Sequence, residues 1–226
     1  MMELYMKKEN KKTNKAISEI IEIGSKTLLS AIPLGGALIT SVWDSVKSNS
    51  AQKRLENWQN LIEERLATVE CTLEEIGQNE NFTTAILNAT EIAVKTAEKE
   101  KHICLANAVF NALSCDIEES VMMMFMNIIN NYTAMHIKTL IFLNEPERFL
   151  TTNFAFITCT PKTLLYDAYP ELAEHDKLVD KIINDLYNDG LISTHNLTTT
   201  MTYQGAIAPR TTELGNQFIE FFTYNT

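Results

Sequence analysis

The stretch Asp176–Ser193, DKLVDKIINDLYNDGLIS, holds the clearest structural signal in the chain. Its apolar residues recur at spacings of three and four, which predicts an amphipathic helix with one buried face. Asp176 is suited to accept the unpaired N–H groups of the first turn, and Gly190 stands where a left-handed residue would end the helix. Leu191 and Ile192 then predict a short strand. The apolar face comprises Leu178, Val179, Ile182, Ile183, Leu186 and Tyr187.

The composition is typical of a mainly helical protein, because Gly and Pro are few while Ala, Ile, Leu and Met are plentiful. The formal net charge of −10 argues against a chain built throughout to bind polyanions. Residues 1–15 nevertheless have a balance of +3, whereas the chain from Asp116 onward carries six basic and fourteen acidic side chains. The four cysteines show neither disulfide-scaffold nor zinc spacing, so we expect reduced thiols and a cytoplasmic location.

Residues 27–43, TLLSAIPLGGALITSVW, carry no charge. A helix of this length would span about 25 Å, short of the roughly 30 Å hydrocarbon core of a membrane. A proline and a glycine pair would also interrupt it. We expect a buried helical hairpin in which Leu34, Leu38 and Ile39 face the core. The alternative is a segment that inserts conditionally into a membrane, with the basic residues 7–15 favouring an anionic leaflet.

Two long helices are predicted over 51–76 and 82–113, the second with a kink near 99–101. The first has an apolar stripe at heptad-like spacing, and the second has an alanine at every fourth position, which lets a neighbouring helix approach closely. We therefore expect an antiparallel helical hairpin, and the same helices offer a surface for self-association into a dimer. The pairing residues are Leu55, Trp58, Ile62, Ala85, Ala89, Ala93 and Ala97.

A third helix is predicted over 116–131, opened by Asp116 and Glu119 in a capping-box arrangement. We place Met124 and Phe125 on its buried face. The methionine-rich run that contains them is interpreted as core, with an adaptable partner-binding surface as the alternative.

A second domain is predicted over 133–226, after a helical domain over 1–132. Thr160 and Pro161 are a favourable N-cap and first helical residue. The Thr-rich stretch 195–209 contains a glycine turn residue and predicts a β-hairpin.

The motifs DGL at 189–191 and TELG at 212–215 resemble the DGL…T-x-x-G signature of MarR-type and related winged-helix domains. This resemblance covers 133–226 and implies that the hairpin at 195–209 is the wing. The expected fold is therefore mainly α, a helical bundle followed by a winged-helix domain with a small β-hairpin. The layout, together with HICLANAVFNAL at 102–113, is similar to bacterial abortive-infection alpha proteins.

No sequence motif for catalysis, phosphate binding or metal ligation is present, so we predict no catalytic residue, metal ligand or cofactor. DNA binding by the winged helix would depend on Lys177, Lys181 and Arg210. Four aspartates and two glutamates lie within or just before the candidate recognition helix, and they would repel a phosphate backbone. We therefore expect this acidic domain to contact protein.

These observations favour a non-catalytic bacterial interaction or regulatory protein, a component of phage defence whose protein partner the sequence does not identify. Two alternatives stay open. One is a winged-helix transcription regulator that binds DNA as a dimer, and the other is a conditional membrane-inserting effector that acts through residues 27–43.

If residues 27–43 are buried, the protein will neither float with liposomes nor release a trapped dye from them, because no apolar segment is available to enter the bilayer. Flotation and dye leakage with vesicles that contain anionic lipid measure this. Leakage that Leu38→Asp abolishes, in a variant that is still folded, would contradict the buried interpretation.

Overall fold

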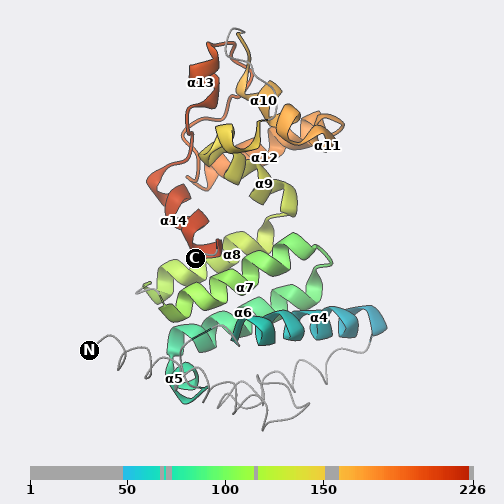
Figure 1. The fold of residues 1–226 in the computed structure, drawn as a ribbon, viewed down its shortest axis with the longest axis vertical. Helices are drawn as coiled ribbons and strands as arrows, with labels where there is room; N and C mark the ends of the chain where they lie inside the picture. Colours follow the sequence, from blue (N-terminus) through green and yellow to red (C-terminus); the bar gives the residue numbers. More distant parts are fainter. Residues whose placement is uncertain (1–47, 67–68, 70–72, 115–116, 151–157, 224–226) are drawn as a thin grey trace, which may run out of the picture. The chain divides into compact units, whose positions relative to one another are not determined.

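The structure, a computed structural model, describes residues 48–66, 69, 73–114, 117–150 and 158–223 (Figure 1). Within these ranges the chain is mainly helical and forms no β-strand, which confirms the predicted mainly α class. The chain divides into two compact units. The first contains the described residues up to Asn130 together with Phe222 and Thr223, and the second contains the described residues from Asn131 to Phe221.

The apolar segment 27–43, with Leu34, Leu38 and Ile39, lies outside the described residues, as does the basic stretch 7–15. The interpretation of this segment as core or membrane element therefore stays a prediction.

The first unit is a layer of antiparallel helices with further helices packed beside it (Figure 1). Helix α6 packs against both α4 and α7, and α4 also contacts α7. Asn107 and Asn111 of α7 donate hydrogen bonds to the carbonyl oxygens of Phe222 and Thr223, at 3.0 and 2.8 Å, which holds these two residues in this unit. The helices are α4 (Asn49–Leu66), α5 (Leu73–Gln78), α6 (Glu80–Lys95), α7 (Lys99–Ser114) and, up to Asn130, α8 (Glu119–Asn131).

Trp58 is the centre of the contact between α4 and α6. Its side chain is fully buried, and its Nε1 donates to the Thr90 hydroxyl at 2.9 Å, which in turn donates to the Ile86 carbonyl at 2.6 Å. Leu55 and Ile62, one turn to either side of Trp58, are also fully buried. On α6 the alanines Ala85, Ala89 and Ala93 are fully buried, and their small size allows the close approach of neighbouring helices.

Neither predicted long helix is continuous. The helix predicted over 51–76 ends at Leu66, and the non-helical Val69 donates to the Leu66 carbonyl at 3.3 Å, a bond to the third residue back instead of the fourth. The helix predicted over 82–113 stops at Lys95, where Thr96 takes an extended conformation and its hydroxyl accepts the N–H of Glu98.

The second break produces a helical hairpin where a kink was predicted. His102 lies against the Ala93 carbonyl and the ring of Phe110 lies against that of Phe82, so α7 runs antiparallel to α6. The predicted alanine ridge therefore ends at Ala93. Ala97 lies beyond the end of α6 and is exposed.

Helix α8 buries Met122, Phe125, Met126 and Ile129. The prediction that Met124 belongs to its buried face is wrong, since this side chain is 40% exposed. An almost continuous apolar run satisfies several helical faces equally, so its periodicity does not identify the buried one.

The second unit is formed by short helices around a core that includes Leu140, Leu164, Ile182, Leu186 and Phe218, all fully buried. Helix α12 packs against α9 and α11, and α10 packs against α11 and α13. Thr160 and Pro161 are the N-cap and first residue of α10, as predicted. The elements are α9 (Ala134–Asn144), the 3-10 helix η1 (Pro146–Phe149), α10 (Pro161–Ala168), α11 (Pro170–Ala173), α12 (Asp176–Asn188), α13 (Tyr203–Ile207) and, up to Phe221, α14 (Glu213–Phe222).

The predicted β-hairpin wing over 195–209 is wrong. Residues 203–207 form the helix α13, and the described part of the unit contains only isolated antiparallel bridges, Cys159 with Met201 and Ile192 with Thr211. The Asn196 side-chain oxygen accepts the backbone N–H of Thr198 at 2.8 Å, and such local bonds take donors that a strand ladder would need.

The two motifs DGL and TELG form one tightly packed junction between α12 and α14. Gly190 has a φ of 73°, and Leu191 N–H donates to the Leu186 carbonyl at 2.9 Å, which is the Schellman pattern of a helix end. The Thr212 hydroxyl donates to the Gly190 carbonyl at 2.6 Å and accepts the N–H of Gly215 at 3.0 Å. Gly215 lies so close to Leu191 that an added Cβ would stand 2.1 Å from its carbonyl oxygen.

Gly215→Ala should therefore lower the free energy of unfolding by about 3 kcal/mol or more, the upper end of the cost of overpacking, because backbone on both sides would have to move. Chemical denaturation followed by circular dichroism measures this. Gly205→Ala is the control, since its Cβ would meet only the flexible Met201 side chain, at 3.3 Å. Equal unfolding midpoints for the two variants would contradict the close approach.

Candidate functional site

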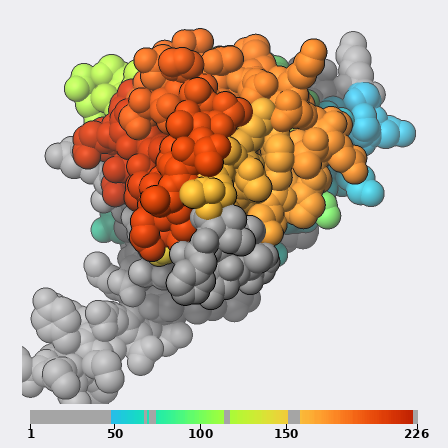
Figure 2. All heavy atoms as spheres, turned by 90° about the horizontal axis from the view of Figure 1, so that it is seen from above, coloured from blue at the N-terminus to red at the C-terminus, as the bar shows by residue number. Residues whose placement is uncertain are grey.

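The candidate site is the exposed side of α12, the helix that we predicted to be the recognition helix of a winged-helix domain. We define this α12 face by residues Lys177, Leu178, Lys181, Asn184 and Tyr187, all of which are exposed. The opposite side of the helix, with Val179, Ile182, Ile183 and Leu186, is buried. Figure 2 shows this end of the chain, where the orange surface of the α10–α12 region borders the redder surface of the residues that follow it.

Lys162, a buried lysine of the neighbouring helix α10, bonds to side chains in the first two turns of α12. Lys162 is only 8% exposed, and its Nζ lies 2.8 Å from an Asp176 oxygen and 2.5 Å from an Asp180 oxygen. Burial alone would lower the pKa of Lys162, but these two carboxylates outweigh burial and raise the pKa. The predicted N-cap role of Asp176 is wrong, because His175 is the N-cap residue and the Asp176 carboxylate accepts from Lys162 and from the Tyr166 hydroxyl.

The C-terminal half of α12 is held by a cluster of polar side chains from the start of α9. The Tyr132 hydroxyl donates to Asp189 at 2.6 Å, and the Tyr132 ring stacks on His136 with their centroids 4.6 Å apart. His136 Nδ1 accepts the backbone N–H of Thr133 at 3.2 Å, while Nε2 faces Asp185 at 3.4 Å. Burial lowers the pKa of His136, and Asp185 offsets this only in part.

Arg210 is an internal structural residue and not part of an exposed basic surface. It is 9% exposed, and its guanidinium donates to the carbonyl oxygens of Gly205, Ala206 and Ala208 at 2.8, 3.1 and 2.5 Å. These bonds satisfy carbonyl groups at the end of α13, which a short helix cannot satisfy by itself. The prediction of Arg210 as a nucleic-acid contact is therefore contradicted by its burial.

The other two predicted DNA contacts lie on the α12 face, but their surroundings are acidic. Lys181 forms an ion pair with Asp185 on the same helix. Lys177 is exposed next to Asp176. Asp180 and Asp185 project from the same helix, so carboxylates outnumber lysines on α12.

Two large apolar side chains interrupt this polar surface. Leu178 is 44% exposed and Tyr187 is 42% exposed, on either edge of the α12 face, so the prediction that they belong to the buried side of the helix is wrong. The Tyr187 ring contacts the His195 ring with their centroids 5.1 Å apart, which fixes one edge of the surface.

Sequence reasoning missed the roles of Lys162 and of the pair Tyr132 and His136. The available signal was the spacing of Asp176 and Asp180, four residues apart on one side of a helix, where a single cation can bond to both. The sequence contained no indication of which cation that would be, because α10 is brought to α12 only by folding.

The described residues contain no group of three or more metal-ligating side chains. His102 lies against the Ala93 carbonyl, and burial raises the pKa of the Cys104 thiol to about 12. None of the helices formed by the described residues is both long and apolar enough to cross a bilayer.

No protein-family model, curated protein or solved structure matches this chain.

Arg210→Met should lower the free energy of unfolding by about 1–3 kcal/mol, because it leaves buried carbonyl groups without a donor. Chemical denaturation measures the change. Lys177→Met removes an equal charge from an exposed position and should change stability by no more than about 0.5 kcal/mol. An Arg210→Met protein as stable as the Lys177→Met protein would show that the guanidinium contacts contribute nothing to folding.

Proposed function

We propose that this protein is a non-catalytic interaction or regulatory protein that contacts another protein through the α12 face. The observation that supports this most is that these cations of the second unit already have partners within it. Arg210 is buried against carbonyl groups, Lys181 pairs with Asp185, and Lys162 pairs with Asp176 and Asp180. A surface arranged in this way has little positive charge to offer a phosphate backbone.

The alternative of a DNA-binding regulator requires several cations aimed at phosphates, since each neutralised phosphate contributes to affinity by releasing counterions. Among the three predicted contacts, Lys177 is the exposed cation for which the described residues give no ion pair. One lysine among several aspartates does not supply the 6–10 or so phosphate contacts of strong DNA binding.

The α12 face has the chemical character of a protein interface. Leu178 and Tyr187 offer apolar contact area, and tyrosine is enriched at interface centres because its ring is large and its hydroxyl tolerates both water and partner groups. The surrounding carboxylates favour a partner that carries Lys or Arg around an apolar contact. Charge complementarity of this kind speeds association and selects the partner.

The cellular setting of the proposal is the bacterial cytosol during phage infection. It is drawn from the similarity in layout to abortive-infection alpha proteins, with HICLANAVFNAL at 102–113 as the family-like piece. Self-association through the helices of the first unit belongs to the same proposal.

The protein should not shift the mobility of duplex DNA at low salt. Any shift that does occur should not be reduced by Lys177→Glu or Lys181→Glu.

A pull-down from infected cells should recover a specific protein partner. Leu178→Glu combined with Tyr187→Glu should abolish that recovery and the effect of the protein on plaque formation. Both side chains are exposed, so these changes leave the core intact.

Met124→Glu is the control, because it places a glutamate at an exposed apolar residue of the first unit. It should keep both partner recovery and phage protection. A lysine-dependent, salt-sensitive DNA shift would support the transcription regulator instead. Absence of a specific partner, with unchanged phage sensitivity on deletion, would refute the proposal.

A further inference from the structure

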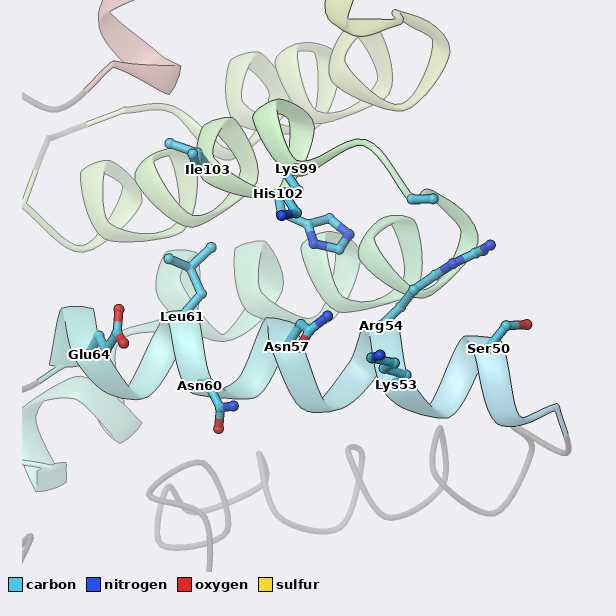
Figure 3. A pocket seen from close by; sticks show the side chains of 11 residues that line it. Ser50, Lys53, Arg54, Asn57, Asn60, Leu61, Glu64, Lys99, His102 and Ile103 are labelled. Atoms are coloured by element: carbon cyan, nitrogen blue, oxygen red, sulfur yellow. The ribbon is translucent and has the colours of Figure 1, made fainter.

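The first unit contains a cavity of about 610 Å³ between α4 and the start of α7 (Figure 3). This volume lies within the roughly 300–1,000 Å³ typical of small-molecule sites. Because α4 and α7 both run antiparallel to α6, their first turns lie at the same end of the helical layer. The cavity is lined by Ser50, Lys53, Arg54, Asn57, Asn60, Leu61, Glu64, Ala97, Lys99, His102 and Ile103.

One end of the cavity is cationic although the protein as a whole is strongly acidic. Lys53 and Arg54 come from the first turns of α4, and Lys99 is the first residue of α7. Among the described residues of the lining, Glu64 is the one carboxylate, and it lies about three turns further along α4. These described lining residues therefore have a charge balance of +2 in a chain whose formal net charge is −10.

Arg54 is fixed in place by the end of α6. Its Nη1 lies 3.3 Å from the carbonyl oxygens of both Val94 and Lys95, which are acceptors that the helix end leaves unpaired. Both bonds use Nη1, and Nε and Nη2 form no hydrogen bond with the described residues. Lys53 and Lys99 form no ion pair with the described residues, and both side chains are exposed.

His102 forms a rigid polar floor in the middle of the cavity. The residue is only 8% exposed, and its ring is directed from α7 toward α4 (Figure 3). Nε2 donates to the Ala93 carbonyl at 3.0 Å, and the edge of the Trp58 ring system packs against the imidazole with centroids 6.3 Å apart. In the neutral ring Nδ1 is then an acceptor, and no described residue bonds to it.

The other end of the cavity has apolar side chains as well as the carboxylate of Glu64. Leu61 of α4 is half-buried there, and Ile103 of α7 is 47% exposed, an unusual exposure for isoleucine. Asn57 lies between the two ends and can donate and accept hydrogen bonds. The cavity therefore has a cationic end and an end at which Leu61 and Ile103 supply apolar surface, with polar groups between them.

We propose that this cavity binds a phosphorylated small molecule of nucleotide size, with its phosphate groups at Lys53, Arg54 and Lys99 and its body along Asn57, His102 and Ile103. Multiple charge-assisted hydrogen bonds to phosphate oxygens supply the anchoring, and the apolar end selects a ligand with a substantial non-phosphate part. This site lies wholly in the first unit and is independent of the α12 face.

Isothermal titration calorimetry of the full-length protein with ATP and with pyrophosphate, without Mg²⁺ and at low salt, tests the site. ATP should give saturable heat, and Lys53→Glu combined with Lys99→Glu should weaken its binding at least tenfold. Lys177→Glu combined with Lys181→Glu is the matched control, with the same change in net charge in the second unit, and should alter the affinity less than twofold.

The apolar end is tested separately. Ile103→Ala should weaken ATP binding several-fold and leave pyrophosphate binding unchanged, and its side chain is exposed enough for the fold to be kept. No saturable heat with ATP would refute the site, and so would equal weakening by the two double charge reversals. Pyrophosphate bound as tightly as ATP would overturn the proposed class of ligand.

Discussion

The close approach of Gly215 to the Leu191 carbonyl oxygen is the constraint on which the second unit depends. It sets the start of α14 directly against the end of α12, and the Thr212 hydroxyl closes the contact by bonding to both sides. The left-handed Gly190 lets the chain leave α12 at the angle that this contact needs. With the end of α12 fixed in this way, its apolar side faces the core and its polar side is presented to solvent.

Two basic residues of the second unit, Lys162 and Arg210, form bonds within the unit. Lys162 binds the start of α12, and Arg210 satisfies the carbonyl groups of α13, so both are nearly buried. A buried cation needs partners of this kind because its desolvation is otherwise costly. The consequence is a surface dominated by carboxylates and a few apolar side chains, which suits a protein partner better than a polyanion. The first unit has the opposite arrangement, with Lys53 and Lys99 left at the rim of a cavity.

Local sequence patterns predicted helix ends correctly where a single residue sets the end. The helix over 176–188 and its glycine stop follow from periodicity and from the left-handed conformation, and the N-cap at Thr160 follows from its hydroxyl and the proline after it. Helix continuity was predicted less well. An apolar pattern continues across Thr96, whereas the hydroxyl of Thr96 accepts a local N–H and lets the chain reverse.

The sequence by itself determined the mainly helical character, the centre of the buried face of α12 and the small residues at the helix contacts, because these depend on spacing and side-chain size along one segment. Only the tertiary structure decided what the charged residues do. The sequence predicted Arg210 to be a cation of the wing, whereas in the structure it bonds to carbonyl groups of α13. Lys162 pairs with its two aspartates because α10 packs next to α12. A charge acts through neighbours that are distant in sequence, so its role is defined by the fold that brings those neighbours within bonding distance.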